Sequence, residues 1–112
     1  MMTLLDQFSF HHTLAETHGV ALVIFTAPHC GSCRVMRHAM TTYGASHPGV
    51  SLFEIDAQRD MALTREFEVF HLPALFLYRD GHFHGEIQCE PLPHRLEYAV
   101  AAAVTLPARE AP

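Results

Sequence analysis

One stretch of the chain, Val20-Ala-Leu-Val-Ile-Phe25, is apolar at every position and rich in β-branched and aromatic residues. A strand with one face in water alternates apolar and polar side chains, so this run predicts a strand covered on both faces. Such a strand lies near the centre of a sheet that helices sandwich. Two further runs, Val50–Ile55 and Ala74–Tyr78, predict two more buried strands. We therefore expect an α/β fold.

Segments with helical spacing of apolar residues separate these strands. In the helix expected over about Ser32–Tyr43, the apolar stripe includes Val35, and Gly44 follows as the C-terminal stop. In the last helix the stripe includes Leu92. The expected helices span Ser9–Thr17, about Ser32–Tyr43, about Asp60–Phe67 and a final segment that starts near Pro93.

The two ends of the chain complete the sheet. Met2–Leu5 predicts a short first strand, and Asp80-Gly81 predicts a hairpin turn into the last strand. Strands and helices that alternate along the chain predict a mixed sheet of four to five strands flanked by helices, with one domain over residues 1–106 and a tail over 107–112. In the last strand, successive side chains alternate between two faces. The apolar face carries Phe83, Gly85, Ile87 and Cys89, and the wet face carries His82, His84, Glu86 and Gln88.

Composition and charge exclude several classes of protein. With 112 residues, 49% hydrophobic and 17% charged, the chain is neither disordered nor a coiled coil. The 7 basic residues, all of them Arg, are outnumbered by 12 acidic residues. The net charge of −5 argues against nucleic acid and lipid headgroups as partners. Without a basic leader or an apolar run of ~18 residues, we expect a cytoplasmic protein that does not bind a membrane.

The segment Cys30-Gly-Ser-Cys33 lies between the first buried strand and the helix after it. Cysteines three positions apart at a helix start lie on one face and can close a disulfide. We expect Cys30 to lie at the helix N-terminus, where free N–H groups and the helix dipole favour a thiolate and lower its pKa. Gly31 lets another backbone approach the first sulfur. Cys33, one turn deeper, is expected to stay a thiol until it attacks.

Two other interpretations of the cysteine pair remain open. Zinc needs four ligands, but Cys89 alone cannot complete a second pair, and none of the 10 His stands at zinc-finger spacing. Alternatively, the two cysteines are inert core residues, because a free cysteine packs like a small hydrophobe. We expect a redox pair with no metal and no bound cofactor.

With these residues in view, the chain resembles the thioredoxin family over nearly its whole length. The likeness rests on Cys30-Gly-Ser-Cys33 after a buried strand, Ile55-Asp56 at the end of the next, Leu72-Pro73 before the third, and the Asp80-Gly81 turn. The resemblance implies that Pro73 is cis and faces the cysteine pair. It also implies that Leu72 offers backbone hydrogen bonds to an extended substrate.

The chain also departs from the family pattern. His29 and Thr26 stand where the family usually has tryptophans. Ile24 replaces a buried Asp that moves protons to the second cysteine, and Leu52 replaces the Lys that pairs with this Asp. Losing both charges of a buried pair together costs less folding free energy than leaving one of them buried without its partner. The proton relay is absent, so deprotonation of Cys33 is expected to rely on water, on His29 or on the leaving thiolate.

The resemblance implies a thiol–disulfide oxidoreductase that acts on protein disulfides and is reduced again by a partner similar to thioredoxin reductase. Cys89 stands where the family usually has Gly on the docking surface, and it is either a groove residue or a core cysteine. A redox-quiet module that binds a client protein is the alternative function. The implied site comprises catalytic Cys30 and Cys33, a docking surface of Gly31, Ser32, Leu72, Pro73 and Cys89, and His29 as a modulator of the pKa of Cys30.

Overall fold

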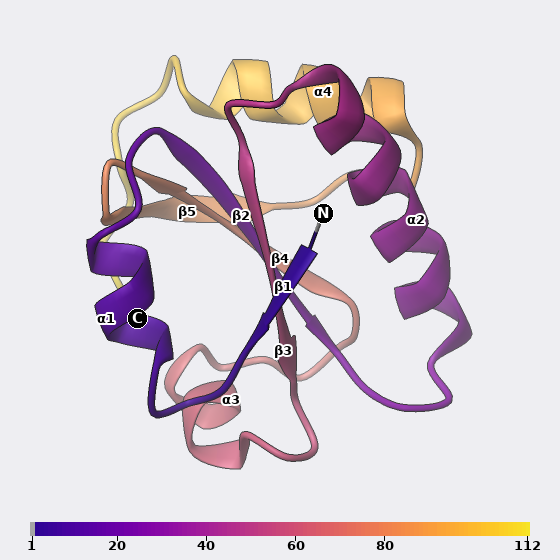
Figure 1. The fold of residues 1–112 in the computed structure, drawn as a ribbon, viewed down its shortest axis with the longest axis vertical. Helices are drawn as coiled ribbons and strands as arrows, with labels where there is room; N and C mark the ends of the chain where they lie inside the picture. The colour runs from indigo at the N-terminus through magenta and orange to yellow at the C-terminus, as the bar shows by residue number, and fades with distance from the viewer. Residues whose placement is uncertain (1) are drawn as a thin grey trace.

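A computed structural model describes residues 2–112 and contains one five-stranded sheet with helices on both faces (Figure 1). Its elements are β1 (Met2–Leu5), α1 (Phe10–Ala15), β2 (Val20–Thr26), α2 (Gly31–Ser46), β3 (Ser51–Asp56), α3 (Met61–Glu66), β4 (Ala74–Arg79), β5 (His82–Ile87) and α4 (Pro93–Ala103). The strand order is β1-β3-β2-β4-β5. The first three strands are parallel, whereas β4 runs antiparallel to β2 and to β5. The predicted mixed α/β sheet is confirmed.

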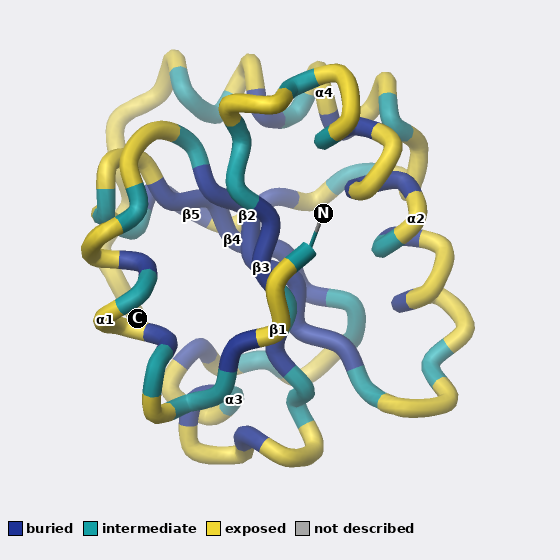
Figure 2. Tube along the Cα trace, viewed as in Figure 1, coloured by how far each residue is buried: buried dark blue, intermediate teal, exposed yellow. Residues whose placement is uncertain are grey.

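Strand β2 lies at the centre of the sheet and is covered on both faces, as its composition predicts. Leu22 and Ile24 are fully buried in a cluster with α2 and α4. Val23 and Phe25 are fully buried in a second cluster, with α1 and α3. Figure 2 shows the central strands as the most continuously buried part of the chain. The sheet thus supports two helical layers, and the helix that follows β2 starts at its end.

The two clusters differ in chemistry. Aromatic rings dominate the cluster under α1 and α3, where Phe67 lies edge-on to Phe10 and Phe76 at centroid distances of 5.5 and 5.0 Å. Such edge-to-face pairs add to the stabilisation from area burial. The cluster under α2 and α4 is aliphatic and includes Met36 and Met40. This second cluster holds α2 on the sheet and therefore positions the start of that helix.

Three expectations about the helices are wrong. Val35 and Leu92 are 53% and 41% exposed, so the buried stripes are narrower than the sequence suggests. Helix α2 does not end at Gly44 but continues to Ser46. A Cβ on Gly44 would lie 2.8 Å from Cδ1 of Leu52, so the glycine lets α2 pack closely on β3.

In residues 2–112, no helix is long and apolar enough to cross a membrane.

Strand β5 also differs from the simple alternation that was expected. The pairing of β4 with β5 shifts at His84, so this strand carries a bulge. Phe83 therefore packs on the aromatic cluster, whereas Ile87 packs on the aliphatic one. His84 is buried rather than solvated, and its Nε2 lies 2.8 Å from the carbonyl oxygen of Ala103. The bulge therefore reverses the alternation, so that side chains before and after His84 do not follow one pattern of faces.

The tight turn between β4 and β5 gives a test of stability. Gly81 has a φ of +82°, and a Cβ there would collide with the carbonyl oxygen of Ala15. We expect Gly81→Ala to lower the free energy of unfolding by about 2 kcal/mol or more, since alanine is strained at positive φ and the backbone cannot retreat. Gly49→Ala is the matched control, because nothing lies within 4 Å of its Cβ position. Urea unfolding of both variants measures the difference, and equal midpoints would contradict this account.

Candidate active site

The Cys30–Cys33 pair lies where β2 ends and α2 begins. Cys30 is the N-cap residue of α2, with extended backbone angles (φ −92°, ψ 103°). Its Sγ accepts the backbone N–H of Cys33 at 3.2 Å. The two residues are joined by a disulfide, and their Cα atoms are 5.2 Å apart. The first sulfur thus lies at the positive end of a 16-residue helix, where free N–H groups stabilise an anion.

The two cysteines differ in access to solvent. Cys33 is 1% exposed, whereas Cys30 is only partly buried. Ser32, between them, is exposed, and its Oγ lies 3.5 Å from Sγ of Cys30. An incoming sulfur can therefore reach the pair through Cys30, while Cys33 is shielded behind it.

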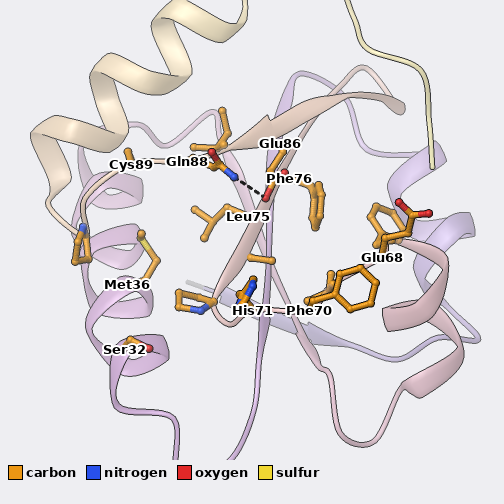
Figure 3. Close-up of a pocket in the computed structure, with 16 residues that line it drawn as sticks. Ser32, Met36, Glu68, Phe70, His71, Leu75, Phe76, Glu86, Gln88 and Cys89 are labelled. Atoms are coloured by element: carbon orange, nitrogen blue, oxygen red, sulfur yellow. Dashed lines mark hydrogen bonds between the residues drawn. The ribbon is translucent and has the colours of Figure 1, made fainter.

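The residues predicted for the docking surface are only partly brought together. Ser32, Pro73 and Cys89 line one groove beside the cysteine pair (Figure 3). The Leu72–Pro73 peptide bond is cis, as the family resemblance implies. Leu72 is half-buried and does not line the groove, and Gly31 is exposed at the start of α2. The groove therefore borders the pair from the side of Ser32.

Cys89 combines the two interpretations that the sequence left open. Its side chain is half-buried and packs against the aliphatic cluster, and it also lines the groove. Burial raises the pKa of the Cys89 thiol, and the charge of Glu90 raises it further. The thiol is therefore expected to stay protonated at neutral pH.

The positions that lack the family's charge pair are filled by apolar side chains. Ile24 is 0% exposed and Leu52 is 3% exposed, so both lie in the core. A charged pair stands nearby instead, between β3 and α2. Glu54 on β3 accepts hydrogen bonds through Oε2 from the hydroxyl of Thr26 at 2.7 Å and from Nη1 of Arg37 at 2.6 Å. Sequence reasoning missed this network.

The Thr26–Glu54–Arg37 network borders a hollow of about 290 Å³ on the other side of Cys30. His29, exposed and with a φ of 65°, lines the same hollow. His29, the predicted modulator of the pKa of Cys30, thus lines the same hollow as Cys30, and its effect on the thiolate stays a prediction. A charged residue inside an otherwise apolar strand is the signal that would have revealed Glu54, because buried charges are paired.

Metal binding finds no support in the arrangement of side chains. Among residues 2–112, no group of three or more His, Cys, Asp or Glu residues is placed to hold a metal ion. The sulfur atoms of Cys30 and Cys33 are joined to each other in a disulfide.

Comparison with known proteins identifies the family to which this fold and sequence belong. The sequence profile described as Thioredoxin matches residues 1–101. The chain belongs to the thioredoxin family. The oxidised form of mitochondrial thioredoxin 3 from Saccharomyces cerevisiae superposes with a TM-score of 0.77 at 25% identity, covering 90% of this chain and 94% of that one.

The sequence relatives of this chain include thioredoxins and longer proteins that contain a thioredoxin domain. Thioredoxin from Chlamydia muridarum is 28% identical, over 72% of this chain and 78% of its own length. Thioredoxin domain-containing protein 2 from Rattus norvegicus is 32% identical over 86% of this chain. The chain spans only 18% of the rat protein and 16% of the mouse protein of that name. What those longer proteins do as a whole does not carry over directly.

The ion pair beside Cys30 is expected to stabilise the fold. Arg37→Met leaves the carboxylate of Glu54, 15% exposed, without its cation and should lower the free energy of unfolding by about 1–2 kcal/mol. Arg37→Met combined with Glu54→Gln should recover more than half of this loss, because the amide still accepts from Thr26. Arg34→Met, which alters an exposed Arg of the same helix, is the control and should stay within about 0.5 kcal/mol of wild type. An equal loss in the control, measured by urea unfolding, would count against the network.

The cysteines of the reduced chain are expected to react at different rates. The helix N-terminus should favour the thiolate of Cys30, whereas burial raises the pKa of the Cys89 thiol. A thiol with a pKa near ~7 is about half ionised at neutral pH, against a few per cent at ~8.5. Iodoacetamide at pH 7 should therefore alkylate Cys30 at least about tenfold faster than Cys89, measured on proteolytic peptides by mass spectrometry. Equal rates would show that the helix end does not activate Cys30.

Proposed function

We propose that this thioredoxin-family chain is a thiol–disulfide oxidoreductase that acts on disulfides of other proteins. The observation that carries the proposal is the asymmetry of its cysteine pair. Cys30 is accessible at the positive end of α2, and Cys33 is buried within disulfide reach of it. This is the arrangement that a two-step exchange requires, with one sulfur for attack and the other for release.

In the first step, the thiolate of Cys30 attacks one sulfur of the substrate disulfide. A bond forms between Cys30 and that sulfur, the substrate S–S bond breaks, and the other substrate sulfur leaves as a thiolate that takes a proton from water. The N–H of Cys33, which donates to Sγ of Cys30 in the oxidised chain, supports the attacking thiolate in the reduced chain. Gly31, exposed at the helix start, leaves the approach to Cys30 open.

In the second step, Cys33 loses its proton and attacks the sulfur of Cys30. The Cys30–Cys33 disulfide forms, the mixed disulfide breaks, and the second substrate thiolate is released. The substrate has then gained two electrons and two protons, and the cysteine pair has lost two electrons. Restoring the dithiol needs an external reductant, for which we propose a partner similar to thioredoxin reductase. The cytoplasmic location remains a prediction.

The second step lacks the buried carboxylate that the family uses. Ile24 cannot accept a proton, and Glu54, the neighbouring carboxylate, is held by Arg37 and Thr26 on the side of Cys30. The proton of Cys33 therefore passes to water, to His29 or to the departing thiolate. The same observation favours a second candidate function, a redox-quiet module that binds a client protein without turnover.

Insulin reduction separates the two functions. The wild-type chain should accelerate the precipitation of insulin by dithiothreitol, and Cys30→Ser should abolish the acceleration because the attacking sulfur is gone. Thr42→Ser, which changes an exposed residue of α2, is the control for a hydroxyl substitution in this helix and should keep the acceleration. Cys33→Ser should instead accumulate a mixed disulfide with insulin, visible on a non-reducing gel. No acceleration by wild type would reject the enzyme and leave the binding module.

A further inference from the structure

The groove beside the cysteine pair extends well beyond the pair itself. From Ser32 and Met36 on α2 it crosses the start of β4 and the end of β5, and it reaches the loop before β4 at Glu68 and Phe70 (Figure 3). Its volume is about 430 Å³, within the range of protein sites that hold ligands. Pro73, the family's docking residue, lies along its floor and accounts for only part of its length.

The far end of the groove is apolar at its rim. Phe70 is 84% exposed, which leaves a large aromatic ring in water next to the half-buried Val69. Burial of such a ring against a partner stabilises a complex, and exposed aromatic rings are typical of interaction surfaces. Figure 3 places Phe70 across the groove from Met36 and Ser32.

The groove carries two carboxylates and one histidine, His71. Among residues 2–112, the Asp, Glu and Arg residues that line it are Glu68 and Glu86, both exposed. Gln88 donates a hydrogen bond to Glu86 at 3.4 Å, but within the described part of the chain neither carboxylate forms an ion pair. An occupant with a cationic side chain would complement this rim.

The tail of the chain limits how an occupant can lie. The N–H of Arg109 donates to the carbonyl of His84 at 2.7 Å, so the tail is hydrogen-bonded to β5 at the bulge. The hollow between the tail and the sheet is lined by Arg109 together with Glu68 and Glu86. A segment that carries an arginine thus already borders a hollow with these carboxylates. A substrate segment therefore has to follow the groove across the strand ends, because the β5 backbone at His84 is already bonded to the tail.

We infer that this groove selects the substrate: it binds the extended protein segment beside the reacting cysteine when that segment carries an apolar side chain for Phe70 and an arginine or lysine for Glu68 and Glu86. The inference rests on the proposed function, because the segment arrives with the disulfide that Cys30 attacks. An extended segment of five residues spans roughly 16 Å, about half of the 30 Å length of the molecule, so five positions on either side of the substrate cysteine cover the reach of the groove to be tested.

Matched peptide disulfides test the selection. Each peptide carries one cysteine joined to thionitrobenzoate, whose release is followed by absorbance. In separate peptides, Arg, Gln or Glu occupies one of the five positions on either side of this cysteine. With the reduced full chain at low salt, the Arg peptide at the preferred position should react at least fivefold faster than the Glu peptide. The ratio should fall toward one in 1 M salt, where the Debye length is only about 3 Å.

Variants locate the effect in the groove. Glu68→Gln and Glu86→Gln should each lower the Arg-to-Glu ratio, whereas Glu97→Gln, on the exposed face of α4, changes the net charge equally and should not. Because the ratio is taken within one variant, a change in cysteine reactivity cancels. Phe70→Ser should lower the preference for a Leu over an Ala next to the substrate cysteine.

Two results would overturn the inference. One is an Arg-to-Glu ratio of one at every position, and the other is an unchanged ratio when Glu68→Gln and Glu86→Gln are combined. If no peptide releases thionitrobenzoate, the proposed function fails instead. In that case fluorescently labelled peptides with Ser in place of Cys, titrated with the oxidised chain, decide by anisotropy whether the groove still prefers Arg over Glu.

Discussion

The packing of α2 on the central strands is the constraint on which the site depends. Ile24 on β2 and Leu52 on β3 lie fully within the aliphatic cluster, beneath Met36 and Met40 of the helix. This contact holds a helix terminus at the end of β2. Because the unpaired N–H groups of a helix are confined to its first turn, only a residue at that terminus gains their stabilisation of a negative charge. Cys30 occupies this position because the core beneath the helix holds it there.

Apolar filling beneath the cysteines has a chemical consequence. Replacing a buried ion pair by well-packed apolar residues is neutral or stabilises a protein by about 1–4 kcal/mol, so Ile24 and Leu52 favour the fold. Neither of these side chains can accept a proton. The carboxylate of Glu54 is held by Arg37 on the side of Cys30 instead. The chain thus keeps a charged pair near its sulfurs, but the pair supports the loop and the helix rather than proton transfer.

The sequence predicted the sheet, its flanking helices and the disulfide pair, because these follow from short-range patterns. Val20–Phe25 shows a strand covered on both faces, and Cys30 and Cys33 stand at the spacing of one helical turn. What it missed depends on contacts between distant segments. The bulge at His84 is set by pairing with β4 and by a hydrogen bond to Ala103, and the bond between Glu54 and Arg37 joins a strand to a helix. Periodicity within one segment carries no information about either contact.

The two sides of Cys30 offer different environments to a substrate. On one side, Arg34 and Arg37 border a hollow together with Glu54 and Asp56. On the other side, Glu68 and Glu86 border the groove, and within residues 2–112 neither of them forms an ion pair. A net charge of −5 alone would attract any basic protein weakly and without orientation. Charges of both signs on one side and unpaired carboxylates on the other instead favour one direction of an extended segment across the sulfur, with its basic residue toward the groove. Attack requires the substrate sulfurs to line up with Cys30, so a surface that orients the segment acts on the rate of exchange as well as on affinity.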